Sequence, residues 1–129
     1  LLRRKARLTP NAILNPTALF SEFKGALAEN YVLQSLMSQF GEIPSYWTSN
    51  GKAEVDFLLS FQNDILPVEV KSGENTRSRS LAVYDEENHP KVKLKYSMRN
   101  LFHQEGLINI PLFLADRTQD FIALAIEHQ

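Results

Sequence analysis

The chain of 129 residues contains no cysteine, which excludes disulfide bonds and thiolate zinc sites. It has no apolar run near the roughly 20 residues that a membrane-spanning helix needs, and no signal peptide is recognisable. The formal net charge is −1, whereas a dedicated nucleic-acid-binding domain is usually visibly basic. We therefore expect a cytoplasmic protein without a membrane partner, in which any contact with nucleic acid depends on local patches.

The sequence also lacks a glycine-rich phosphate loop and a nucleophile elbow, so this stretch is not expected to hydrolyse ATP. Its histidines, His89, His103 and His128, are scattered and do not have the spacing of metal ligands. Hydrophobic residues make up 43% of the chain and charged residues 22%, which is typical of a globular domain. The length suits one domain with a single core.

Residues 53–71 combine apolar alternation with charge alternation, which predicts two strands of a β-hairpin. A polar cluster around Gln62 and Asn63 separates the strands and predicts the turn. Centred there, antiparallel pairing places apolar residues opposite one another: Val55 with Val70, Phe57 with Val68, and Leu59 with Leu66.

The same register places Asp56 opposite Glu69 and Glu54 opposite Lys71, with opposed Cβ atoms about 4.5 to 5.5 Å apart. Two adjacent carboxylates repel unless a divalent cation, a shared proton or a basic neighbour neutralises them. Lys71 lies on the same face as Glu69. Carboxylate oxygens bind Mg²⁺, which polarises a phosphate and lowers the pKa of an attacking water, and a lysine can orient that water or stabilise the phosphate charge.

A long helix is predicted from Pro16 to Phe40, with Gly41 ending it. Its predicted apolar stripe consists of Phe23, Leu27, Leu33, Leu36, Met37 and Phe40. Glu29 lies at the edge of that stripe, so it either faces the sheet or reaches solvent. Glu22 lies two turns earlier on the same face.

Residues 45–50 predict a short strand, in which Trp47 either packs or offers a surface for base stacking. A polar loop with Arg77 and Arg79 follows the hairpin, and these arginines are either solvated or contact phosphate. A short helix is expected over 81–88, with Ser78 or Ser80 as its cap, closing at His89 and Pro90.

Residues 91–98 predict a half-buried strand with Val92, Leu94, Tyr96 and Met98 on one face. Its other face carries Lys91, Lys93 and Lys95, which is typical of an edge strand or of a wall that contacts nucleic acid. Residues 100–109 are expected to form a loop. Pro111 is expected to open a final helix, whose Leu114, Phe121, Leu124 and Ala125 would pack on the sheet.

Asp56, the Glu69-Val70-Lys71 strand end and Glu29 together resemble the PD-(D/E)xK nuclease superfamily, whose fold is restriction-endonuclease-like. More narrowly, the blocks KGALAENYV, AEVDFLL, PVEVKSG and INIPLFLA occur in the order found in an uncharacterised domain that follows an AAA-type ATPase domain in many bacterial and archaeal proteins. This resemblance runs from about Phe23 to Phe113.

The resemblance implies an α/β fold with an αβββαβ core, in which a mixed sheet is flanked by helices. It assigns residues 16–129 to a nuclease-like domain and residues 1–15 to a linker or the remnant of a preceding domain. The basic residues of that segment are then solvated or form a phosphate-contacting arm. Because the chain begins without methionine, we expect it to be the C-terminal part of a larger protein, with an N-terminal ATPase domain as its partner.

The resemblance also implies a catalytic site of Glu29, Asp56, Glu69 and Lys71. Asp56 and Glu69 would bind Mg²⁺ or Mn²⁺, Lys71 would position the attacking water, Glu29 would support the metal or its waters, and DNA or another nucleic acid would be the substrate. Two alternatives remain open. One is a non-catalytic module of the same fold that binds DNA or a protein partner and regulates the ATPase. The other is a solvated sheet face, on which Glu54 pairs with Lys71 and Asp56 pairs with a loop arginine.

Overall fold

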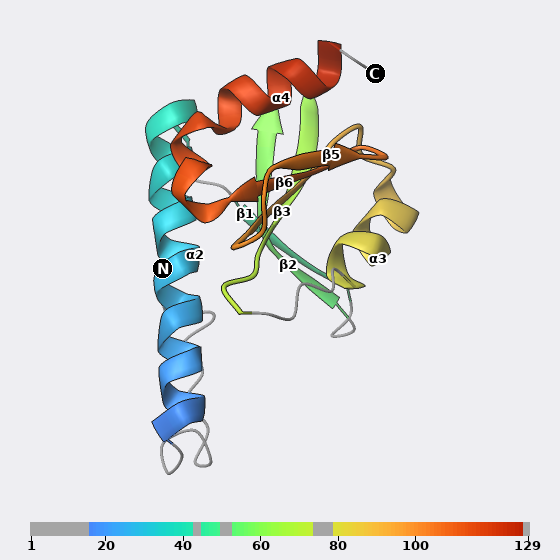
Figure 1. Ribbon diagram of the computed structural model, residues 1–129. Helices are drawn as coiled ribbons and strands as arrows, with labels where there is room; N and C mark the ends of the chain where they lie inside the picture. Colours follow the sequence, from blue (N-terminus) through green and yellow to red (C-terminus); the bar gives the residue numbers. More distant parts are fainter. Residues whose placement is uncertain (1–15, 43–44, 50–52, 74–78, 128–129) are drawn as a thin grey trace.

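The computed structural model describes residues 16–42, 45–49, 53–73 and 79–127 (Figure 1). Within these ranges the helices and strands follow the order that the sequence predicts, α then three β, then α and β. The elements are α2 (Pro16–Phe40), β1 (Ser45–Ser49), β2 (Ala53–Phe61), β3 (Asp64–Val70), α3 (Arg79–Asn88), β4 (Lys93–Ser97), β5 (Phe102–Gln104), β6 (Leu107–Pro111), η2 (Leu112–Arg117) and α4 (Thr118–Glu127). The predicted linker over residues 1–15 lies outside the described residues.

The strands form one mixed sheet in the order β1-β2-β3-β4-β6-β5. The first three pair antiparallel, as adjacent strands joined by short turns do, while β4 runs parallel to β3 and β6 runs parallel to β4. Parallel addition of β4 requires a crossover, which α3 supplies. The predicted α/β class, αβββαβ order and mixed sheet are therefore confirmed.

The hairpin of β2 and β3 has the predicted turn. Gln62 and Asn63 have φ angles of 48° and 66°, the left-handed pair that a two-residue type I′ turn requires. The predicted pairs Phe57 with Val68 and Leu59 with Leu66 are confirmed. The ladder covers 57–61 and 64–68, so the predicted pairing of Val55 with Val70 lies beyond its end.

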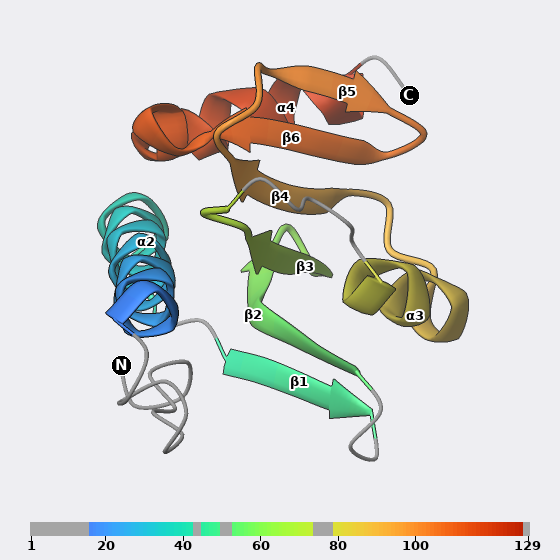
Figure 2. The same cartoon turned by 60° about the horizontal axis from the view of Figure 1, so that its bottom comes forward.

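The core occupies both faces of the sheet. The larger cluster joins α2 and α4 to the sheet through fully buried residues such as Leu36, Tyr96 and Ile122. A smaller cluster joins α3 to the sheet through Val55, Leu81 and Tyr84. Figures 1 and 2 accordingly show α2 and α3 on opposite sides of the sheet.

The predicted apolar stripe of α2 is wrong in its N-terminal half. Phe23 and Leu27 are 58% and 49% exposed, whereas Ala26 and Glu29 are buried. The cause is the direction of the buried face, because Ala26 and Glu29 share it with Leu33 and Leu36, while Phe23 and Leu27 lie on another face of the same turns. At the other end Gly41 has a φ of 73° and donates its N–H to the Met37 carbonyl at 2.9 Å, which confirms the predicted end.

Strand β4 lies inside the sheet rather than at its edge, so the edge-strand interpretation is wrong. Its neighbours are β3 and β6, and Lys95, on the face that carries the lysines, is only 6% exposed. Met98 follows the end of the strand and is exposed.

The predicted loop over residues 100–109 is also wrong, because β5 and the start of β6 form a hairpin there. Its turn at Glu105 and Gly106 has φ angles of 50° and 80°. A Cβ on Gly106 would lie 3.1 Å from the Lys91 carbonyl oxygen, so glycine suits the close approach as well as the φ angle.

After Pro111 the chain forms the 3-10 helix η2 before α4, so the predicted single helix is divided in two. Ala125 is buried as predicted, but Leu124 is 52% exposed and Ile122 occupies the core instead. Gln39 of α2 joins these segments to the long helix by donating to the Ala115 carbonyl at 2.8 Å and accepting the Gln119 N–H at 3.0 Å.

Candidate functional site

Three predicted acidic site residues come from three different elements and are all buried. Glu29 lies on α2, Asp56 on β2 and Glu69 on β3, with 4%, 0% and 3% of their surfaces exposed. Glu29 therefore faces the protein interior rather than bulk solvent. A solvated sheet face with Asp56 in an exposed ion pair is excluded by the same burial.

One hydrogen bond brings Asp56 to the end of β3. Its Oδ2 accepts the Val70 N–H at 2.7 Å. Successive amides of a strand point to opposite neighbours, and here the Lys71 N–H donates to the Tyr96 carbonyl of β4 at 2.8 Å while the Val70 N–H points toward β2. The Asp56 carboxylate thus lies against the backbone between Glu69 and Lys71, where the β2–β3 ladder has ended.

Lys71 extends over Glu69 from the first position after β3. Its Nζ lies 3.5 Å from Glu69 Oε1, and its side chain is 36% exposed where that of Glu69 is 4% exposed. Lys71 is therefore the basic neighbour of Glu69 that the sequence predicts. Because Lys71 reaches both the buried carboxylate and solvent, it lies where a ligand from solution would first meet the site.

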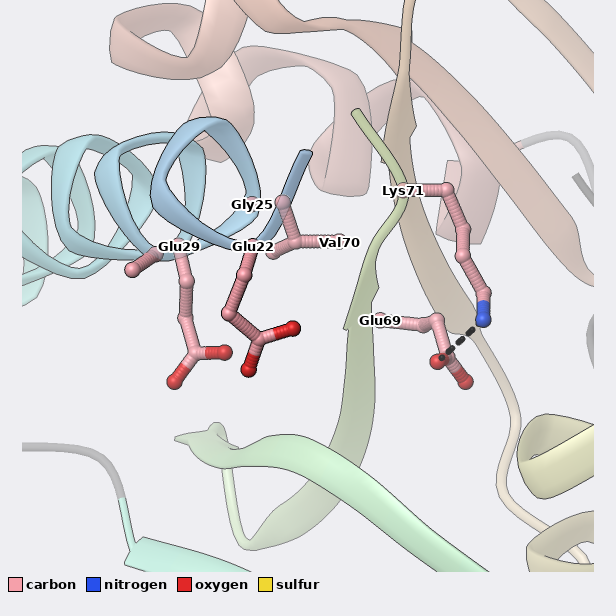
Figure 3. Close-up of a pocket in the computed structure, with 7 residues that line it drawn as sticks. Glu22, Gly25, Glu29, Glu69, Val70 and Lys71 are labelled. Carbon is pink, nitrogen blue, oxygen red and sulfur yellow. Dashed lines mark ion pairs between the residues drawn. The ribbon is translucent and has the colours of Figure 1, made fainter. Parts of the chain in front are cut away.

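A pocket of about 120 Å³ lies between α2 and the end of β3, which is room for several water molecules. Small residues of α2, Gly25 and Ala26, line it together with Glu22, Glu29, Glu69, Val70 and Lys71. Figure 3 shows the Glu22 and Glu29 side chains extending from α2 on one side of the β3 ribbon, with Glu69 and Lys71 on its other side. The structure therefore brings both candidate acidic residues of the helix to the pocket.

The donor set suits a hard divalent cation. Asp56 and Glu69 offer carboxylate oxygens, which Mg²⁺ and Mn²⁺ prefer over nitrogen or sulfur ligands. In the described ranges no group of three or more His, Cys, Asp or Glu side chains could hold a metal ion. A cation here would therefore be bound by one or two carboxylates and complete its shell with water or phosphate oxygens, as Mg²⁺ commonly does.

Lys95 belongs to the surroundings of this site, and the sequence analysis missed it. It is the register partner of Glu69 on β4 and is almost fully buried. Burial lowers the pKa of Lys95; the Glu69 carboxylate opposes this shift, while Lys71 and Arg99 add to it. The available signal was its position on the strand that follows the Glu69 strand through a crossover helix, which makes the two strands parallel neighbours.

Asn109 continues the same row across the sheet as the register partner of Lys95 on β6. It is 1% exposed and accepts the Ser97 hydroxyl at 2.7 Å. Its Nδ2 donates to the carbonyls of Arg99 and Asn100 at 3.3 and 3.0 Å. These bonds fix the chain after β4, on the side of the sheet where Glu69 and Lys95 lie.

Other predicted candidates do not join the site. Arg79 is exposed at the start of α3, which also rules out Ser80 as the cap of that helix, and His89 and His103 are exposed. The structure does not describe Arg77, Ser78 or His128, nor the side chain of Trp47.

The fold and the site together define an α/β domain with buried carboxylates near the end of β3 and two neighbouring lysines, of which Lys95 is buried and Lys71 is partly exposed. No described helix is long and apolar enough to span a membrane. A family model, described as a domain of unknown function (DUF4143), matches residues 24–114, and the chain belongs to this family. The matched segment is nearly the one that resembled an uncharacterised domain. Comparison with curated proteins and with solved structures gave no match.

Proposed function

We propose that this domain hydrolyses phosphodiester bonds of nucleic acid with the help of a divalent metal ion. One observation carries the proposal: the bond from Val70 N–H to Asp56 Oδ2 holds a second buried carboxylate beside Glu69 and Lys71. Burying two like charges together is costly, and a bound cation would offset that cost. The αβββαβ order and the acidic residues of α2 support assignment to the PD-(D/E)xK superfamily.

Asp56 and Glu69 are the residues that would hold Mg²⁺ or Mn²⁺. The ion would polarise a phosphate oxygen and lower the pKa of a bound water. Lys71, half exposed above Glu69, would orient the attacking water and offset charge on the phosphate. Glu29 and Glu22, which line the same pocket, would orient waters from the side of α2.

A second candidate is a non-catalytic module that binds DNA or a protein partner and regulates an attached ATPase domain. The near-neutral net charge of −1 favours a protein partner over DNA as its ligand.

The test is calorimetric titration of the chain with Mn²⁺, run beside cleavage assays on plasmid DNA, single-stranded DNA and RNA. Asp56→Asn is expected to lose both metal binding and cleavage. Asp64→Asn is the matched control: Asp64 also accepts a backbone N–H, from Ile65 at 2.9 Å, but it is the first residue of β3, at the opposite end of the strand from Glu69. A wild-type chain that binds no Mn²⁺ and cleaves none of the three substrates would overturn the nuclease proposal and leave the regulatory module.

A further inference from the structure

Lys91 precedes strand β4, and Lys93 and Lys95 lie in it. The structure gives each of these three lysines a different environment. Lys91 is exposed. Lys93 pairs with Asp85 of α3, with Nζ 3.5 Å from Oδ2. Lys95 is 6% exposed and, among the residues that the structure describes, is the one Lys or Arg that is buried.

Lys95 lies beside Glu69 because of the sheet register. The two residues are direct partners in the parallel pairing of β3 with β4, so their side chains project from the same face of the sheet. Lys71 contacts the same carboxylate from the chain end beyond β3. Glu69 therefore has one half-exposed lysine and one buried lysine as neighbours.

We propose that Lys95 is a positioning residue of the candidate site: from the β4 side it attracts and orients the Glu69 carboxylate, and it weakens the binding of a divalent cation there. Its low exposure argues against contact with a substrate, so it acts through Glu69. The attraction of Lys95 for Glu69 is independent of the proposed nuclease function, whereas its effect on metal affinity rests on that function.

The charges explain both effects. The Lys95 ammonium attracts the Glu69 carboxylate. Solvent screens the partly exposed Lys71, whereas it screens the buried Lys95 much less. The same ammonium repels a second cation that approaches Glu69. Arg99 adds positive charge near Lys95, and Asp56 adds negative charge near the end of β3.

A double-mutant cycle tests the attraction without metal or substrate. Lys95→Met, Glu69→Gln and the double variant are unfolded with urea in the presence of a chelator. We expect the two single substitutions to be non-additive, with the double variant more stable than the sum of the single effects predicts. Additive effects would overturn the inference, whatever the outcome of the nuclease assay. If Lys95→Met gives no cooperative transition, Lys95→Gln takes its place in the same cycle.

Calorimetry with Mn²⁺ tests the effect on the metal. Lys95→Met is expected to bind Mn²⁺ about tenfold more tightly than the wild-type chain, since a like charge has been removed. Lys95→Arg should keep the wild-type affinity. Lys93→Met is the matched control on the same strand and should also leave the Mn²⁺ affinity unchanged.

A residue that only fills space would change stability alone, so unchanged or weaker Mn²⁺ binding by Lys95→Met would overturn this effect. If the wild-type chain binds no Mn²⁺, the proposed function fails, and the double-mutant cycle still decides whether Lys95 and Glu69 interact.

Discussion

The hydrogen bond between Val70 N–H and Asp56 Oδ2 predicts a stability difference between two substitutions at one position. Asp56→Asn retains a carbonyl oxygen that can accept the amide, whereas Asp56→Ala removes that acceptor. Both substitutions remove the negative charge, so relief of repulsion with Glu69 is the same in each. The difference contains the hydrogen bond together with the side-chain volume that alanine loses, and we expect Asp56→Ala to be less stable by at least about 0.5 to 1.5 kcal/mol.

The assay is equilibrium unfolding in urea with a chelator present, so that metal binding does not contribute. With a slope of about 2 kcal/mol per M, the midpoint of Asp56→Ala should lie about 0.5 M below that of Asp56→Asn, at an unchanged slope. The same pair of substitutions at Asp64 is the control, because its bond to Ile65 N–H is exposed and water can replace the lost acceptor. Equal midpoints for the two Asp56 variants would refute the reasoning, since the Val70 amide would then need no carboxylate or amide acceptor.

Two further predictions concern the fold. Leu36→Ala should lower the free energy of unfolding by about 2 to 5 kcal/mol because Leu36 is fully buried, while Leu27→Ala, at a 49% exposed position of the same helix, should change it by less than about 0.5 kcal/mol; similar losses in urea unfolding would contradict the assignment of the buried face. Burial raises the pKa of Tyr96 above its ordinary value of 10.0, with the Thr118 hydrogen bond opposing. The unfolded chain then releases the phenolic proton first, so this contribution to stability is present below pH 10.0 and is lost as the pH rises further. The stability advantage of the wild-type chain over Tyr96→Phe should therefore shrink in alkaline urea titrations, and the exposed Tyr31→Phe serves as the control; a constant difference would contradict it.

Local rules were enough to predict the elements that contain the site. Helix α2 was predicted from proline, apolar spacing and Gly41, and the hairpin from alternation around Gln62 and Asn63. Each of these signals acts within a few residues of the chain, so the sequence alone contains the information. The hairpin register and the resemblance of the motif predicted Asp56 and Glu69 as neighbouring site residues, whereas their burial was not predicted.

The errors concern features that depend on how the elements are arranged. Phe23 and Leu27 have apolar side chains, but the face of α2 that is buried at these turns is the one that carries Ala26 and Glu29. Lys95 alternates like a surface lysine, yet it lies on a strand inside the sheet and is almost fully buried. The short strand β5 has three exposed residues and no alternation of burial, so it lacked the signal that identifies a strand.

The site lies where the pairing of β2 with β3 ends. Strand β2 pairs with β3 as far as Phe57 and Val68, and β3 then continues beside β4 alone. A strand end that leaves its partner exposes amides that need other acceptors, and Asp56 supplies one for Val70. The Asp56 carboxylate is therefore held beside Glu69 at the point where the β2–β3 ladder ends. Lys71 is the first residue after β3, and Lys95 lies on the neighbouring strand β4. A substitution that shifted the hairpin register by one residue would move Asp56 to the other face of the sheet and separate these groups, so the apolar pairs Phe57 with Val68 and Leu59 with Leu66 position the site as well as stabilise the core.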